Sequence, residues 1–215
     1  MKNIKLVIFD LDGTLFNTKP GIMKAIMKTM DEKGLERPSE EICDSFIVPP
    51  IEDSFVRVYG VSREESKELS NQFRGYYGED DYLYQTEEYE GMRETLSELK
   101  KRGMKLALAT YKKEWMAEKL CRHFGYDVFL DSLHGSDPEG KRTKAGIINM
   151  CMEECGCASS ETLMVGDTDF DALGARDAGT AFAGVTYGCG FANRKDVEFY
   201  EGAVAIDSPK ELLEL

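Results

Sequence analysis

The sequence predicts an α/β fold, a doubly wound parallel sheet, with a helical segment inserted after the first strand. Short apolar segments alternate with longer segments in which apolar residues recur every three or four positions. Strands that alternate with helices form parallel sheets through right-handed crossovers. A third observation predicts the insertion: the helical pattern continues over residues 16–88, but no convincing strand occurs there.

The first strand and the insertion come first in the chain. Ile4–Phe9 is a continuous apolar strand. Pro20-Gly21 opens a helix whose apolar residues recur every four positions, and Gly34 is placed to end it. A capping-box pattern at Ser62–Glu65 opens a further helix. We therefore expect a helical cap over residues 16–88 and an α/β core formed by residues 1–15 and 89–215.

The rest of the chain alternates regularly. We expect helices that end near glycines, namely Gly103, Gly125, Gly156 and Gly179. Between and after them we expect the strands Lys105–Ala109, Val128–Leu130, Leu163–Val165, Phe182–Val185 and Val204–Ile206.

Composition limits the classes of function. The chain has 215 residues and a net charge of -13, which argues against a nucleic-acid polymer or an anionic membrane surface as partner. No run approaches the roughly 20 apolar residues of a membrane span, and the N-terminus lacks a signal-peptide pattern. We expect a soluble, cytoplasmic protein that is a monomer or a weak homodimer.

The cysteines and histidines do not indicate a metal site, a disulfide framework or histidine-based catalysis. The six cysteines form no paired CxxC units, so free thiols are favoured over structural zinc or disulfides. With two histidines, of which His123 is expected to be packed, a histidine-based nucleophile or metal site is poorly supplied.

Carboxylate, hydroxyl and lysine side chains follow four of the expected strands. Ligands of parallel α/β sheets bind beyond the carboxyl ends of the strands. Several carboxylates and a lysine at one edge need a hard cation and an anion, and Mg²⁺ takes oxygen ligands while it bridges to phosphate. The residues that predict this site are Asp10, Asp12, Thr110, Lys144, Asp167 and Asp171.

These motifs resemble those of a known family. DLDGTL at residues 10–15, a strand that ends on Thr110, a lysine and then GDTDFD at residues 166–171 resemble the haloacid dehalogenase superfamily of phosphatases. The helical insertion resembles the helical cap of that superfamily. The stretches YEGMRETLSELKKRGMKLALAT and GSDPEGKRTKAGII are most similar to the phosphoglycolate phosphatase and 5′-nucleotidase-like branch.

The resemblance implies a role for each motif residue. Asp10 resembles the nucleophile that forms an aspartyl-phosphate, and Asp12 resembles the general acid that later acts as base. Thr110 resembles a hydroxyl donor to the phosphoryl group, and Lys144 resembles the cation that balances the charge. The implied Mg²⁺ ligands are Asp10, the carbonyl of Asp12, Asp167 and, directly or through water, Asp171. The tight turn at Gly13 and Thr14 would bind phosphoryl oxygens.

The third motif leaves alternatives open. Relatives commonly have a lysine followed by prolines, whereas this chain has Lys141-Arg142-Thr143-Lys144. The spacing to the following helix favours Lys144, but Lys141 or Arg142 could serve.

The cap is expected to select the substrate. Pro49-Pro50-Ile51-Glu52 resembles the specificity loop of the family. Candidate substrate contacts are Arg57, Arg74, Tyr111, Lys112 and Lys19, although surface charge is an alternative for the cap residues. The cap aromatics could stack on a base or pack the cap; they are Tyr76, Tyr77, Tyr82 and Tyr84.

We expect a Mg²⁺-dependent phosphomonoester hydrolase that acts on a small soluble phosphorylated metabolite, either phosphoglycolate-like or a nucleotide 5′-monophosphate. One alternative is a dehalogenase or phosphonate hydrolase on the same fold, and Asp12 counts against it because those relatives typically lack the second acid. The other is a non-catalytic metabolite-binding regulatory protein. The intact set of acids counts against that, because binding alone needs no general acid.

Overall fold

The computed structural model describes residues 3–37, 39, 42, 46–47, 51–79 and 82–215. The chain divides into two compact units, which we describe separately. Unit 1 consists of Met1–Phe16 and Glu88–Leu215, and unit 2 of Asn17–Glu87.

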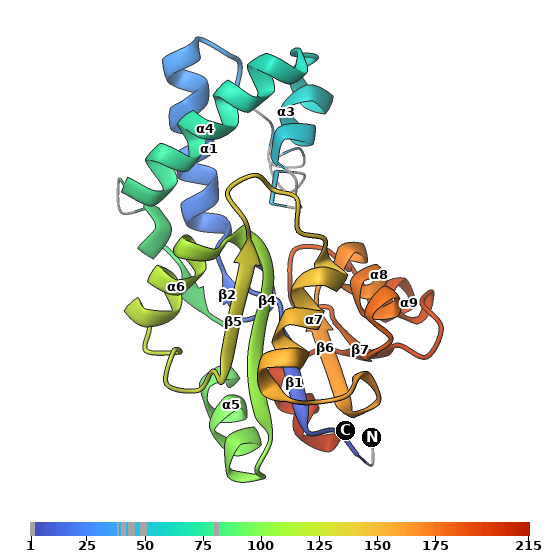
Figure 1. Ribbon diagram of the computed structural model, residues 1–215. Helices are drawn as coiled ribbons and strands as arrows, with labels where there is room; N and C mark the ends of the chain where they lie inside the picture. Colours follow the sequence, from blue (N-terminus) through green and yellow to red (C-terminus); the bar gives the residue numbers. More distant parts are fainter. Residues whose placement is uncertain (1–2, 38, 40–41, 43–45, 48–50, 80–81) are drawn as a thin grey trace. The chain divides into compact units, whose positions relative to one another are not determined.

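Unit 1 is built on a six-stranded parallel sheet (Figure 1). In spatial order, the strands are β5 (Ser132–Ser136), β4 (Lys105–Lys113), β1 (Leu6–Phe9), β6 (Thr162–Gly166), β7 (Ala181–Val185) and β8 (Val204–Ile206). β1 and β6 are buried along their whole length, which explains why Leu6–Phe9 and Leu163–Val165 are continuous apolar runs. The predicted fold class is confirmed.

Helices surround this sheet. They are α5 (Met92–Lys101), α6 (Glu114–His123), α7 (Lys144–Cys155), α8 (Asp169–Ala178) and α9 (Arg194–Glu198), with short 3₁₀ turns at Ser159–Glu161 and Pro209–Glu214. Leu6 and Ile8 pack with Ile147 and Ile148 of α7 and Ala172 of α8 in one apolar core. Successive strand residues point to opposite faces of a sheet, and the remaining β1 residues are buried too. Both faces of the sheet are therefore covered.

The strand expected at Val128–Leu130 is wrong. These residues form a turn, in which Leu130 N donates to Asp127 O, and the side chain of Val128 is 76% exposed. The strand begins at Ser132, which pairs with Ala107. Because β5 is the edge strand of the sheet, it carries the polar residues SLHGS instead of an apolar run.

β4 is longer than expected. It continues to Lys113, and its register with β5 shifts between Ala109 and Lys113. This β4 extension, defined as residues 110–113, carries Thr110, Tyr111 and Lys112 to the carboxyl end of the sheet.

Unit 2 is helical. It contains α1 (Lys19–Lys33), α3 (Ile51–Tyr59), α4 (Arg63–Glu79) and a 3₁₀ turn at Tyr82–Tyr84. Gly34 ends α1 with a φ of 64°, as expected. The capping box before α4 is confirmed, because Glu65 Oε2 accepts from Ser62 N over 3.0 Å and Ser62 Oγ accepts from Glu65 N over 3.2 Å. At the two ends of the insertion, β2 (Phe16–Asn17) pairs with β3 (Glu87–Glu88).

The cysteines that the structure describes are all free thiols, as expected; Cys43 lies outside the described residues. Over the same described residues, no helix combines the length and the apolar character needed to cross a lipid bilayer.

Candidate active site

A tight turn follows β1 and holds the first two acids. Asp10 N donates to Val165 O of β6 over 2.8 Å, so the end of β1 is fixed against its neighbour. Beyond it, Leu15 N and Phe16 N both donate to Leu11 O over 3.0 Å. Gly13 adopts a φ of 80°, and a Cβ there would lie 2.2 Å from Oδ2 of Asp167. The glycine is therefore required both by the turn and by the close approach of Asp167.

Asp167 follows β6 and is held by backbone N–H groups. Its Oδ2 accepts hydrogen bonds from Cys189 N (2.9 Å) and Gly190 N (3.1 Å). A Cβ on Gly190 would lie 2.1 Å from the carbonyl oxygen of Asp167, so this loop passes too close for a side chain. On the other side, Thr14 Oγ1 lies 3.4 Å from Asp167 Oδ1. Asp167 is thereby held in place by the loop after β7 and by the turn after β1.

Asp171 is the third residue of α8. Its Oδ2 accepts from Thr168 N (3.0 Å) and Thr168 Oγ1 (2.7 Å), which ties the carboxylate to the N-terminus of the helix. A Cβ on Gly166 would lie 2.3 Å from Asp171 Cβ. The glycine that ends β6 therefore gives Asp171 its place beside the sheet.

Lys144 is the first residue of α7, which Thr143 caps by accepting a hydrogen bond from Gly146 N. Its Nζ lies 2.5 Å from Asp10 Oδ1 and 2.7 Å from Asp171 Oδ1. The other two cations considered for this position lie elsewhere: Arg142 Nη1 donates to Glu114 Oε2 and Gly135 O, and Lys141 is exposed. Of the three, Lys144 is the one that the structure brings to Asp10.

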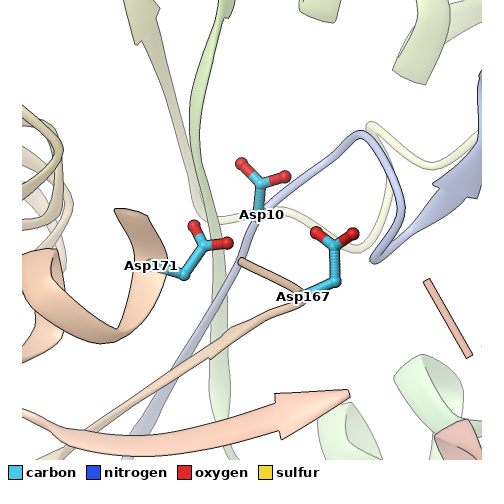
Figure 2. A group of neighbouring side chains, drawn as sticks. All are labelled: Asp10, Asp167 and Asp171. Carbon is cyan, nitrogen blue, oxygen red and sulfur yellow. The ribbon is translucent and has the colours of Figure 1, made fainter. Parts of the chain in front are cut away.

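Three buried carboxylates meet at this point (Figure 2). Asp10, Asp167 and Asp171 each offer an oxygen atom, and these atoms lie within 4.8 Å of one another. Figure 2 shows the three side chains converging from the end of β1, the end of β6 and the start of α8. Oxygen ligands at this spacing suit a hard divalent cation.

The electrostatics of the cluster agree with a cation site. Burial raises the pKa of Asp10 well above its ordinary value; the Lys144 ammonium opposes this, and Asp171 and Asp167 add to it. Burial and then Asp171 raise the pKa of Asp167 to about 7, against the N–H groups of Cys189 and Gly190. For Lys144, burial lowers the pKa, but Asp10 and Asp171 outweigh it and raise the pKa above its ordinary value. One ammonium therefore compensates three carboxylates only in part.

The β4 extension lies beside the turn after β1. Lys112 Nζ lies 2.8 Å from Asp12 Oδ1, and Thr110 Oγ1 accepts from Lys112 N over 3.1 Å. Tyr111 OH accepts from Lys144 N over 2.9 Å. Tyr111 thus contacts the backbone of Lys144, and Lys112 pairs with Asp12.

The expected cap residues belong to unit 2. Arg74 Nη2 lies 2.6 Å from Glu52 Oε1, and Arg57 Nη2 lies 3.2 Å from Ser54 Oγ. Tyr77 is buried and stacks on Phe73, so this aromatic residue packs inside unit 2. Pro49 and Pro50 lie outside the described residues.

Several contributors to the site were missed by the sequence reasoning. The ion pair between Lys112 and Asp12 spans 100 positions of the chain, and no local pattern indicates it. Thr168 could have been recognised as an N-cap residue two positions before the Phe-Asp pair of GDTDFD. The others are glycines that lie close to Lys144 or Asp167, namely Gly174, Gly188 and Gly190.

Comparisons with known proteins identify the family to which the chain belongs. The family model described as haloacid dehalogenase-like hydrolase matches residues 7–185. A 5′-nucleotidase of Pseudomonas aeruginosa is 34% identical over 86% of this chain and 83% of its own length. A phosphoglycolate phosphatase of Vibrio parahaemolyticus is 32% identical over 100% of this chain and 96% of its own length.

The solved structures agree. A haloacid dehalogenase-like family hydrolase from Streptococcus pneumoniae superimposes with a TM-score of 0.90 at 30% sequence identity, over 100% of this chain and 99% of that one. The chain therefore belongs to the haloacid dehalogenase-like hydrolase family.

Proposed function

We propose that this haloacid dehalogenase-like phosphatase hydrolyses the monophosphate esters of small soluble molecules with Mg²⁺, through an aspartyl-phosphate on Asp10. The observation that carries the proposal is the meeting of Asp10, Asp167 and Asp171 with the Lys144 ammonium at the carboxyl end of the sheet. A buried carboxylate beside a lysine and a cation site can approach an anionic phosphate that it would otherwise repel.

The metal would be held by Asp10, Asp167 and the carbonyl of Asp12, with Asp171 as a further carboxylate, directly or through water. Its chemistry at this site is to neutralise charge and to orient the phosphoryl group. Both oxygens of Asp171 also interact within the protein, one with Lys144 and one with Thr168. Asp171 therefore fixes the position of Lys144 in addition to its share in the cation site.

The residues divide the reaction into two steps. In the first, an oxygen of Asp10 bonds to phosphorus while the bond to the leaving oxygen breaks, and that oxygen takes the proton of Asp12. In the second, a water oxygen bonds to phosphorus, Asp12 takes the water proton, and the bond to Asp10 breaks to restore its carboxylate. Thr110 would bind a phosphoryl oxygen. Gly13 N and Thr14 N, which the sequence suggested for the same role, donate to Phe16 O and Leu11 O within the turn.

We further propose that unit 2 is a cap that selects the substrate and that unit 1 is the catalytic core. The bounds expected from the sequence, 16–88 for the cap and 1–15 with 89–215 for the core, differ from these units by one residue at each junction. Arg57 and Arg74 are its candidate contacts for a polar or anionic group. The names of the two relatives support two substrate classes, phosphoglycolate-like acids and nucleotide 5′-monophosphates. The cytoplasmic location and the monomeric or weakly dimeric state stay predictions from composition.

The experiment is an assay of the purified chain with p-nitrophenyl phosphate in Mg²⁺, in EDTA, and with Mg²⁺ restored. We expect hydrolysis that EDTA abolishes and Mg²⁺ restores. A panel of phosphoglycolate, nucleotide 5′-monophosphates and sugar phosphates then identifies the substrate class from kcat/KM. No release of phosphate from any of these compounds, with release of halide from a haloacid or no turnover at all, would contradict the proposal.

A further inference from the structure

We propose that Lys112 is a positioning residue that holds the carboxyl group of Asp12 in place for proton transfer to and from the substrate. This inference rests on the function proposed above, because it concerns the general acid of that reaction. It begins from the ion pair between Lys112 Nζ and Asp12 Oδ1 at 2.8 Å.

The pair is buried. The side chain of Lys112 is 5% exposed and that of Asp12 is 19% exposed. Removing an ammonium group from water costs several kcal/mol. The attraction between the two charges offsets this cost only when the geometry of the pair is good, and the net gain in stability is then small. Such a pair is weak evidence for stability, so a role in the adjacent chemistry is the better explanation of its position.

Both partners have fixed backbones. Asp12 lies in the turn after β1, where Gly13 N donates to Phe16 O over 2.8 Å. Lys112 lies in the β4 extension, and Thr110 Oγ1 accepts from its backbone N. A Cβ on Gly135 of β5 would lie 2.7 Å from the carbonyl oxygen of Lys112, so the neighbouring strand packs closely against this backbone. The two side chains therefore meet from two rigid supports.

The chemistry needs such a support. A general acid must hold its proton within hydrogen-bond reach of the leaving oxygen as that oxygen gains charge. An aspartate has two side-chain torsions, and a contact at Oδ1 restrains the plane of the carboxyl group. Oδ2 is then the oxygen that we assign to proton transfer. Misplacing a catalytic group by about 1 Å can cost about 100-fold in rate.

A competing role for Lys112 is direct binding of the substrate, for which the sequence analysis considered it a candidate. The two roles make different predictions. Loss of a substrate contact changes KM for all substrates alike, whereas misplacement of the general acid slows the chemical step most where the leaving group most needs a proton.

The test uses Lys112→Met, which keeps the length of the side chain without its charge, and two substrates of similar shape, p-nitrophenyl phosphate and phenyl phosphate. Single-turnover rates report formation of the aspartyl-phosphate. We expect Lys112→Met to lower the rate with phenyl phosphate about tenfold more than the rate with p-nitrophenyl phosphate, whose leaving group needs little protonation. Lys112→Arg keeps the positive charge and should bring the ratio of the two rates most of the way back to the wild-type value. If Lys112→Met does not fold, Lys112→Arg is tested alone, and we expect it to shift the ratio less than a loss of the charge would, in the same direction.

Two controls isolate the effect. Lys113→Met alters the next residue, whose Nζ donates to Asp137 O over 2.6 Å, and should leave the ratio unchanged. In an Asp12→Asn background, Lys112→Met should change the single-turnover rate with p-nitrophenyl phosphate by less than about twofold. The carboxyl group that Lys112 positions is already absent from that background.

An equal loss on both substrates, an effect confined to KM, or additive losses in the double variant would overturn the inference and leave the phosphatase function standing. If the wild-type protein itself hydrolysed neither ester with Mg²⁺, both the proposed function and this inference would fail.

Discussion

Gly174 of α8 lies against the side chain of Lys144, so closely that a Cβ on Gly174 would be 2.5 Å from Lys144 Cγ. Gly174→Ala should therefore push the buried lysine away from Asp10. We expect a loss of about 1–3 kcal/mol in the free energy of unfolding, as in other overpacked cores, together with lower turnover. Urea unfolding and a Mg²⁺-dependent phosphatase assay measure the two effects.

Gly75 provides the matched control for that substitution. It also lies in a helix, but a Cβ there would meet no atom within 4 Å. Gly75→Ala should stabilise the protein by up to about 1 kcal/mol through helix propensity. Equal effects of the two substitutions would contradict the steric argument for Gly174.

The nucleophile can be tested by Asp10→Asn. The amide keeps the shape of the side chain but cannot form the aspartyl-phosphate, so hydrolysis should fall to background. The fold should survive, because Lys144 retains Asp171 as a partner at 2.7 Å. Circular dichroism and a turnover assay distinguish the two results. Retention of about a tenth or more of wild-type turnover would rule out nucleophilic attack by Asp10.

Substitutions of Asp12 and Asp167 should affect catalysis and metal binding differently. Asp12→Ala should slow turnover by about 10²–10⁴-fold, the usual contribution of general acid–base catalysis. It should spare Mg²⁺ affinity, because the ligand that we propose at that position is the carbonyl oxygen. Asp167→Ala should weaken Mg²⁺ binding directly. Calorimetric titration with Mg²⁺ compares them, and a comparable loss of affinity in Asp12→Ala would refute the division of roles.

The three cations near α7 should differ in importance. Lys144→Ala leaves two buried carboxylates without their ammonium and should cut turnover by orders of magnitude. Arg142→Ala removes the partner of Glu114 and should have a few-fold effect, and Lys141→Ala still less. The assays are run at saturating Mg²⁺. Near-normal turnover of Lys144→Ala beside an inactive Arg142→Ala or Lys141→Ala would move the role to that residue.

Asp131 should contribute stability that depends on pH. Burial raises its pKa, but hydrogen bonds from Lys100 Nζ and Leu106 N outweigh it and hold the pKa below the ordinary 3.8. Because the folded state binds the proton less tightly, the stabilisation is complete above that ordinary value. It is lost as the pH falls through the lower, folded value.

Asp131→Asn should accordingly destabilise the protein at pH ~7 by about 1 kcal/mol after solvent screening. The difference from the wild type in urea unfolding should shrink as the pH falls below about 4. Asp127→Asn, at an exposed position of the preceding turn, serves as control and should show no such trend. A difference that stays constant with pH would mean that the carboxylate charge is not involved.

The parts of the fold and site that local patterns could predict are those set by single strands and helix starts. β1 and β6 are recognisable because they are buried runs that end on acids, so Asp10 and Asp167 were placed correctly at strand ends. The start of α7 followed from its spacing, which put Lys144 ahead of Lys141 and Arg142. Lys144 Nζ does lie beside Asp10 Oδ1 in the structure, whereas its catalytic role stays a prediction.

The remaining features depend on contacts between distant segments. β5 was misplaced because an edge strand needs no apolar run, and Val128 attracted the assignment although it lies in a turn. The pairing of Lys112 with Asp12 requires β4 to extend beyond Thr110, which residue types alone do not indicate. The close approach of Gly190 to Asp167 likewise exists only once β6 and β7 are neighbours.

The pairing of β2 with β3 has a consequence for how such a protein can change over evolution. The chain departs from unit 1 at Phe16 and returns at Glu88, and these two positions belong to neighbouring strands, which lie about 4.8 Å apart in any sheet. An inserted segment whose ends are neighbours can be lengthened, exchanged or replaced by a short turn with little strain on the flanking chain. Asp10 and Asp12 stand just before the point of insertion. The acids can thus be inherited unchanged while the segment after them is replaced as one block. With the roles proposed above, the chemistry and the choice of substrate can then evolve at different rates.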